Sequence, residues 1–248
     1  ETGTIFPVEQ LAQLAHQAGA LFHTDAVQAV GKLPIDLAAS EIDMLSLSGH
    51  KLHGPKGIGA LYVRKGTRLR PLIRGGHQER GRRAGTENAP GIIGLGKAAE
   101  LAMAHMQDEQ TRVAALRDRL EQGLLERISH CFVTGDPDHR LPNTANVAFE
   151  YIEGEAILLF MNREGIAASS GSACTSGSLE PSHVLRAMNV PYTAAHGAIR
   201  FSFSRENGEA DVDRVLEVMP QVIARLREMS PFWREREKQG AGFNPTYA

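Results

Sequence analysis

The sequence has few cysteines, no long apolar stretch and almost no net charge. Its only two cysteines are Cys131 and Cys174, too few for a disulfide framework, so we expect a chain of the reducing cytoplasm. No window approaches the roughly 18 consecutive apolar residues of a spanning helix, and no signal peptide is visible at the start. The 27 Lys and Arg against 29 Asp and Glu argue against nucleic acid or an acidic membrane as a partner.

Helical and short extended patterns alternate in the first part of the chain. Val8, Leu11 and Leu14 have helical spacing within residues 7–19, which end in a glycine. Short apolar runs bounded by turn residues follow at 20–23, 44–47 and 59–63, and each predicts a strand. This alternation favours an α/β architecture with a mostly parallel sheet.

A different pattern begins near Pro90, where apolar residues spaced three or four apart predict a long helix that continues past Leu124. Runs at 131–133, 145–149 and 199–203 then predict strands of a second, smaller α+β unit. A helix follows around 215–226, which Pro220 should bend or divide, and the tail from Pro231 has little periodicity. We therefore divide the chain into part of a large domain, residues 1–105, and a small C-terminal domain, residues 106–248.

The segment Ser46-Leu-Ser-Gly-His-Lys51 places a lysine in a turn directly after a predicted strand. Folds of the α/β class bind ligands at such strand ends, and a partly neutral lysine there can form a Schiff base with an aldehyde cofactor. A Gly-His-Lys turn considered alone is more often a solvated loop. The signal gains weight from Asp25, which ends an earlier predicted strand and which can pair with a cationic ring nitrogen. Considered alone, Asp25 would more often cap a helix.

The two cysteines lie in different surroundings. Cys174 is in a run of Ser, Gly, Ala and Thr that cannot pack a core, so we expect a surface loop able to carry a nucleophilic thiol. The alternative is a small residue tolerated in a loop. Cys131 lies in the apolar stretch HCFVTG and is predicted to be an inert, packed residue.

Four segments together resemble one protein family: HTDAVQAVGKLPID, SLSGHKLHGPKGIGALYVR, GGHQERGRRAGTEN and SSGSACTSGSLEPSHVLRAM. In order and spacing they are similar to the signature blocks of cysteine desulfurases, which are fold-type I pyridoxal 5'-phosphate enzymes of the class V aminotransferase family. The segment GGHQERGRRAGTEN and the later segment PYTAAHGAIRFS look closest to the nitrogen-fixation, NifS-like branch. The resemblance implies a large cofactor-binding domain, incomplete here because the family has a further N-terminal part, and a small C-terminal domain.

The resemblance also implies the residues of a cofactor site. Lys51 would hold pyridoxal phosphate covalently, Asp25 would face its pyridine nitrogen, and Gln28 would contact its ring hydroxyl. Thr86 would reach the phosphate of a neighbouring subunit, which implies a homodimer. The turn before Lys51 would complete the site with Ser48, Gly49 and His50, of which Ser48 and His50 would bind the phosphate.

The implied reaction converts L-cysteine to L-alanine. Arg200 would pair with the substrate carboxylate, Lys51 would shuttle the α proton, and His50 would assist as an acid or base. The Cys174 thiolate would attack the substrate sulfur and become a persulfide. That sulfur would serve an iron–sulfur scaffold or another acceptor protein, and Cys174 could thereby contact an iron–sulfur cluster as a metal site.

Several alternatives stay open. The same scaffold could support a selenocysteine lyase or an aminotransferase, and the chain could be a non-catalytic fragment that acts as a binding module. A zinc site at His50 and His53 is disfavoured because no third ligand has suitable spacing. The basic run at 79–83 could bind phosphate, but a place at a dimer interface is the better interpretation because Thr86 follows it.

Overall fold

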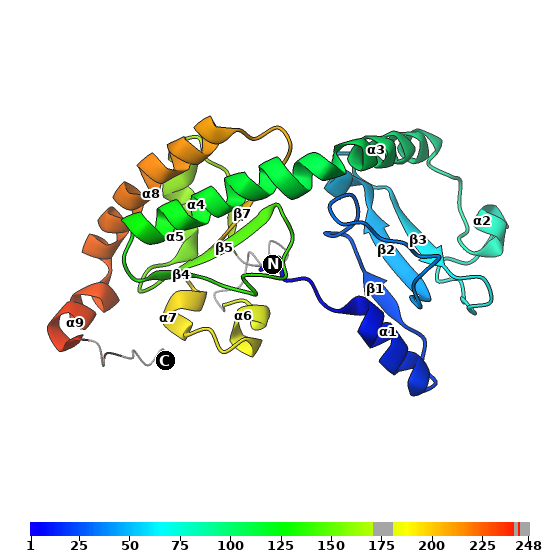
Figure 1. Cartoon of the computed structure of the whole chain (residues 1–248), viewed down its shortest axis with the longest axis horizontal. Helices are drawn as coiled ribbons and strands as arrows, with labels where there is room; N and C mark the ends of the chain where they lie inside the picture. Colours follow the sequence, from blue (N-terminus) through cyan, green and yellow to red (C-terminus); the bar gives the residue numbers. More distant parts are fainter. Residues whose placement is uncertain (171–180, 241–242, 244–248) are drawn as a thin grey trace. The chain divides into compact units, whose positions relative to one another are not determined.

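The computed structural model describes residues 1–170, 181–240 and 243, and it contains two compact units (Figure 1). The N-terminal unit is Phe6–Gln107, and the C-terminal unit consists of Glu1–Ile5 together with Asp108–Ala248. The domains proposed from the sequence, 1–105 and 106–248, therefore differ from these units at the first five residues and slightly at the division. Each unit has its own sheet and its own core.

The N-terminal unit is built on a three-stranded sheet of order β1-β2-β3. Helix α1 (Val8–Gln17) precedes β1 (His23–Asp25), and β2 (Met44–Ser48) leads through the 3₁₀ turn η1 (Gly49–Leu52) into β3 (Gly59–Val63). Helices α2 (Gln78–Gly81) and α3 (Ala89–Asp108) follow. The chain is thus of the α/β class that the sequence predicted.

Only one of the two strand pairs in this sheet is parallel. Strands β1 and β2 run parallel, with Asp25 opposite Ser46, whereas β2 and β3 are antiparallel. Residues 49–58 connect β2 to β3, and they are fewer than the dozen or more that a parallel crossover requires. The expectation of a mostly parallel sheet is therefore not met within the described strands, because the connection after Lys51 is too short.

The core of this unit lies between α1 and one face of the sheet. Ala12 of α1 packs with Ile42 and Leu45, and these residues are at most 3% exposed. Successive residues of a strand point to opposite faces, so Leu45 and Leu47 of β2 join this core while Ser46 and Ser48 face away from it. One face of the sheet is therefore apolar and packed against α1, and the other face carries polar side chains.

A buried carboxylate fastens α1 to the start of β1. Asp43 Oδ2 accepts hydrogen bonds from the Phe22 backbone N–H and from His16 Nε2, each at 2.8 Å, and His16 Nδ1 lies 3.4 Å from Glu41. The hydrogen bond to Asp43 raises the pKa of His16 above its ordinary value. The bonds from His16 and Phe22 lower the pKa of Asp43. The charged forms of both groups are therefore favoured in the folded unit.

The C-terminal unit contains a four-stranded antiparallel sheet of order β4-β5-β7-β6. Its strands are β4 (Cys131–Val133), β5 (Thr144–Phe149), β6 (Ser169–Ser170) and β7 (Ala198–Ser202). A π-helical turn η2 (Glu109–Val113) leads into α4 (Ala114–Arg127), and the remaining helices are α5 (Gly154–Arg163), α6 (His183–Ala187), α7 (Tyr192–Ala195), α8 (Glu209–Met229) and α9 (Pro231–Gln239). Among the described residues, no helix has both the length and the apolarity needed to cross a membrane.

Helices cover both faces of this sheet. Val147 and Phe149 of β5 pack with residues of α4, α5 and α8, whereas the intervening Ala148 packs with Leu185 of α6 and Ala194 of α7. All six residues of β5 are buried. The central strand β5 is therefore buried on both sides, as expected for a sheet enclosed between helical layers.

Two features of the C-terminal end differ from the sequence predictions. Pro220 lies inside α8, which continues as one helix from Glu209 to Met229. The residues after Ser230 form α9, although they lack apolar periodicity. Ser230 caps that helix by accepting a hydrogen bond from the Trp233 backbone N–H, and the Arg227 guanidinium lies 4.3 Å from the centre of the Trp233 ring. Capping and a cation–π contact stabilise α9 in place of a periodic apolar face.

The ion pair of His16 and Asp43 predicts a specific pH dependence of stability. The contribution of His16 is complete below its ordinary pKa of 6.5 and is lost as pH rises through its raised folded value. That of Asp43 is complete above 3.8 and is lost as pH falls through its lowered folded value. Asp43→Asn should therefore make the unfolding free energy, measured by urea denaturation, depend less on pH both where Asp43 is protonated and where His16 loses its proton. Glu41→Gln, the more distant partner, should change the profile less; parallel wild-type and Asp43→Asn curves would contradict this.

Candidate functional site

Lys51 lies in η1, a turn closed by backbone hydrogen bonds. The Gly49 N–H donates to the Ile58 carbonyl at 2.9 Å, and the Gly54 N–H donates to the Gly49 carbonyl at 2.9 Å. His53 ends the turn in the left-handed conformation, with φ of 62°. The turn follows directly from β2, so Lys51 is presented at the carboxyl end of a strand that runs parallel to its neighbour β1, where α/β folds bind ligands.

Glycines allow the chain to approach itself closely around this turn. A Cβ atom at Gly49 would lie 2.8 Å from Ile58 Cγ2 and 3.2 Å from the Pro55 carbonyl oxygen. A Cβ atom at Gly54 would lie 3.0 Å from the Ala98 side chain of α3. Because Gly54 has no side chain, the turn can pack closely against Ala98 of α3. Gly49, expected among the cofactor-binding residues, thus has a structural reason to be glycine.

The Lys51 side chain is half-buried and is free of internal partners. Within the described residues, no hydrogen bond or ion pair to its amine is present. Most buried or half-buried lysines are held by carboxylates, and such pairing keeps the ammonium form charged. An unpaired lysine beside a strand end is suited to react with a carbonyl compound.

Asp25 ends β1 at the same edge of the sheet. It lies opposite Ser46 in the parallel pair, and its Oδ1 accepts a hydrogen bond from the Val27 backbone N–H at 2.9 Å. The Ala26 N–H continues the pairing by donating to the Ser46 carbonyl at 3.0 Å. Gln28 follows in the exposed turn after β1. Asp25 is exposed, so its carboxylate is accessible to a cationic group.

The two residues predicted to bind phosphate are joined to each other. Ser48 Oγ and His50 Nδ1 share a hydrogen bond of 2.7 Å across the start of η1. His50 is exposed, and Ser48, His50 and Lys51 lie within four consecutive residues. A hydroxyl, an imidazole and an amine are donors that suit an anion such as a phosphate ester.

A neighbouring hydrogen bond was not anticipated from the sequence. His23 Nε2 and Ser46 Oγ lie 2.7 Å apart, which joins β1 to β2 on the face that carries Asp25. The signal that could have identified it is strand alternation, because His23 and Asp25 are two residues apart and therefore share a face.

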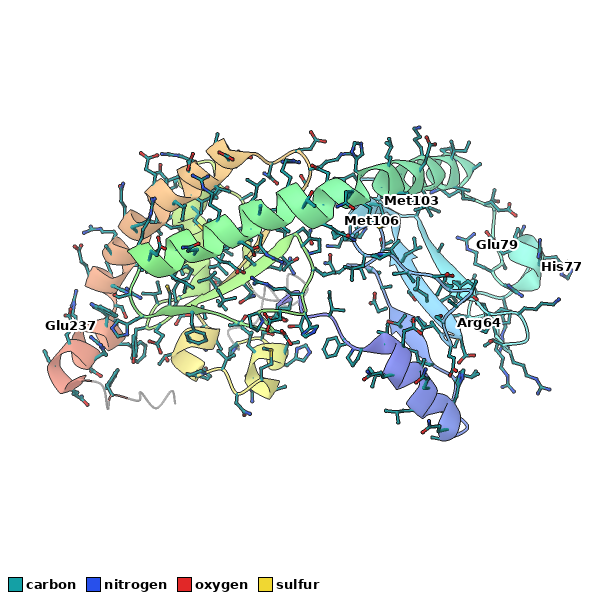
Figure 2. The ribbon with its side chains drawn as sticks, in the orientation of Figure 1. Arg64, His77, Glu79, Met103, Met106 and Glu237 are labelled. Carbon is teal, nitrogen blue, oxygen red and sulfur yellow. The ribbon has the colours of Figure 1, made fainter. Side chains whose placement is uncertain are left out.

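Thr86 lies in the same unit, in an exposed segment between α2 and α3. Its backbone carbonyl accepts a hydrogen bond from the Arg83 guanidinium at 3.1 Å. His77 is the residue before α2, and Glu79 lies within α2 at the start of the basic run 79–83 (Figure 2).

Arg200 belongs to the C-terminal unit, in β7. It lies opposite Asn146 of β5 on one side and Ser169 of β6 on the other. Ser169 and Ser170 lead into residues 171–180, so the predicted nucleophile Cys174 lies outside the described residues. The last described residues before this segment, Ser169 and Ser170, pair with Arg200 and Ile199 of β7.

Cys131 is a packed residue, as predicted. Its side chain contacts the main core of the C-terminal unit, its thiol donates to the Ile128 carbonyl at 3.0 Å, and burial raises its pKa. A raised pKa lowers the thiolate fraction and so the reactivity. In the described part of the chain, no group of three or more His, Cys, Asp or Glu side chains is placed to hold a metal ion.

These residues fit pyridoxal phosphate in the chemistry of their donor set. Asp25 offers an anionic oxygen for a protonated ring nitrogen, Lys51 offers an amine without a partner for the aldehyde, and Ser48 with His50 offers donors for the phosphate. The three groups lie at the carboxyl ends of two adjacent parallel strands. The fold and this constellation are those of an α/β enzyme domain that binds an anionic aldehyde cofactor.

Comparisons with known proteins identify the family. A model of the class-V aminotransferase family matches residues 1–215, and the chain belongs to that family. It is 81% identical over its whole length to a cysteine desulfurase of Gluconacetobacter diazotrophicus, and 67% identical to the cysteine desulfurase NifS of Azotobacter vinelandii, in each case covering 62% of the relative. The chain thus spans about three-fifths of these relatives.

Solved structures show the same fold. The chain is similar to a NifS-like protein from Rickettsia africae, with a TM-score of 0.83 and 29% identity, covering 90% of this chain and 59% of that one. A second NifS-like protein matches with a TM-score of 0.82 and 38% identity, covering 91% and 59%. The α/β architecture predicted from the sequence is therefore confirmed as that of the NifS-like proteins.

The crowding at Gly49 predicts that an added methyl group disrupts the Lys51 turn. Gly49→Ala should lower the unfolding free energy by about 1–3 kcal/mol, because its Cβ would overlap Ile58 and crowd a carbonyl oxygen. The matched control is Gly96→Ala in α3, where a Cβ meets nothing within 4 Å and where alanine should stabilise the helix by up to about 1 kcal/mol. Urea denaturation measures both, and equal effects would show that the turn is not tightly packed.

Proposed function

We propose that the full chain is a pyridoxal-phosphate-dependent cysteine desulfurase. The observation that carries the proposal is the arrangement of Lys51, Asp25 and the Ser48–His50 pair at one edge of the parallel strands β1 and β2. The family membership and the similarity to cysteine desulfurases support it. The reaction is the conversion of L-cysteine to L-alanine, with transfer of sulfur to a cysteine of the enzyme.

Each residue of the N-terminal unit has a separate task in this proposal. Lys51 would hold the cofactor aldehyde and would move the α proton of the substrate. Asp25 stabilises the protonated ring nitrogen, while Gln28 contacts the ring hydroxyl. When bound, pyridoxal phosphate supplies an electron sink for negative charge at the substrate α carbon. His50, with Ser48, binds the phosphate and assists proton transfer.

The sulfur is accepted by the C-terminal unit. The Arg200 guanidinium, whose planar donors suit a carboxylate, binds the substrate carboxylate. The Cys174 thiolate attacks the substrate sulfur, the carbon–sulfur bond breaks with its electron pair left on carbon, and a persulfide forms on Cys174. This assignment is supported by the pairing of Ser169 with Arg200, because the chain that carries Cys174 begins beside the carboxylate-binding residue.

The partners follow from the same proposal. Thr86 contributes to the phosphate site of a second subunit, so the enzyme is a homodimer. The persulfide serves an iron–sulfur scaffold or another acceptor protein, in nitrogenase assembly if the chain belongs with the NifS-like branch, and Cys174 contacts iron only through that sulfur. A reducing cytoplasm is the expected compartment, supported by the thiol chemistry.

The two cysteines provide the test. Cys174→Ser in the full chain should leave cofactor absorbance intact and abolish alanine and persulfide formation, because a serine hydroxyl is far less acidic and nucleophilic than a thiol. Cys131→Ser should keep full activity and cost about 1–3 kcal/mol of stability by placing a hydroxyl in an apolar site. Alanine release and mass spectrometry of the added sulfur are measured for both variants. An active Cys174→Ser variant, or persulfide on Cys131, would overturn the proposal.

A further inference from the structure

The face of the sheet that carries Asp25 contains a second polar pair that the proposed reaction does not use. Asp25 and His23 lie on the same face of β1 because they are two residues apart. Ser46 of β2 lies directly opposite Asp25 in the register, and its Oγ shares a hydrogen bond of 2.7 Å with His23 Nε2. Ser46 therefore has His23 and Asp25 as neighbours on the adjacent strand.

The state of the Asp25 carboxylate depends on what its neighbours donate. Oδ1 accepts from the Val27 N–H, and in the part of the chain that the structure describes no donor to Oδ2 is recorded. A serine hydroxyl rotates freely about its Cβ–O bond and donates one proton. Without His23 as an acceptor, the Ser46 hydroxyl could turn toward the carboxylate of Asp25, which lies opposite it in the register. A carboxylate that accepts such a bond is a weaker partner for a cationic ring nitrogen, because its charge is already partly compensated.

We infer that His23 is a positioning residue that holds the Ser46 hydroxyl away from Asp25, so that one Asp25 oxygen stays available for the ring nitrogen of the cofactor. In this arrangement His23 Nε2 accepts a hydrogen bond from the Ser46 hydroxyl. The inference rests on the proposed function, since it assigns Asp25 to the cofactor ring. It adds two residues, His23 and Ser46, that act on the cofactor only through Asp25.

A purely structural role makes a different prediction. If the hydrogen bond only fastened β1 to β2, then removal of either partner would have the same effect, and removal of both would be no better than removal of one. Under the positioning role the two partners are not equivalent. Loss of His23 releases a hydroxyl toward Asp25, whereas loss of Ser46 removes that hydroxyl altogether.

The experiment is a double-mutant cycle in the full chain, read by binding of pyridoxal phosphate and by the absorption spectrum of the bound cofactor, which reports the charge state of its ring. His23→Ala should weaken cofactor binding by about three- to tenfold, the size of one hydrogen bond, and shift the spectrum. Ser46→Ala should bind nearly as the wild type does. His23→Ala combined with Ser46→Ala should recover most of the lost affinity and the original spectrum.

Two controls complete the test. His23→Gln retains an amide that can engage the hydroxyl, and it should preserve binding better than His23→Ala. Thermal unfolding of the cofactor-free variants shows whether any loss arises from general destabilisation. Equal losses in both single variants without recovery in the double variant would overturn the positioning role while leaving the proposed function intact. A wild-type full chain that binds no pyridoxal phosphate would overturn the proposed function, and this inference with it.

Discussion

The parallel pairing of β1 with β2 is the constraint on which the candidate site depends. The pairing joins three residues of each strand and places Asp25 opposite Ser46. The carboxyl end of β2 leads directly into the turn that carries Lys51. A shift of one residue would put Asp25 on the same face as Leu45, so that either the carboxylate would enter the apolar core or Leu45 would leave it. Burial of Leu45 and Ile42 therefore sets the chemistry indirectly, because the same register that packs the core presents the carboxylate.

The surrounding contacts maintain this register from both sides. At the start of the two paired strands, Asp43 binds both His16 of α1 and the Phe22 backbone N–H, and so connects α1 to the residue before β1. At the carboxyl end of β2, backbone hydrogen bonds from Gly49 and Gly54 close the turn, and Ala98 of α3 packs against it. Among the described residues Lys51 has no internal hydrogen-bond or ion-pair partner, so these contacts hold the backbone of the site while the amine stays available. Such separation of support from chemistry is typical of preorganised sites.

Sequence patterns predicted the helices and strands well where local signals were strong. The α/β class, the apolar face of β5 and the packing of Cys131 follow from alternation and hydrophobicity. The antiparallel β3 was missed because strand direction depends on connection length, which apolar patterns do not report. Helix α9 was missed because capping by Ser230 and the contact of Trp233 with Arg227 replace periodicity. The bond of His23 to Ser46 joins residues 23 positions apart, and only the register of two strands reveals it.

The central claim is that the chain presents Lys51, and no other lysine, to an aldehyde cofactor at the edge of β1 and β2. The most direct measurement is borohydride reduction of the full chain with pyridoxal phosphate bound, followed by peptide mapping with mass spectrometry. The account predicts a single covalent adduct on the peptide that contains Lys51, and its loss in Lys51→Ala. An adduct on Lys56, which is exposed in the same connection, or on the buried Lys32, would contradict it.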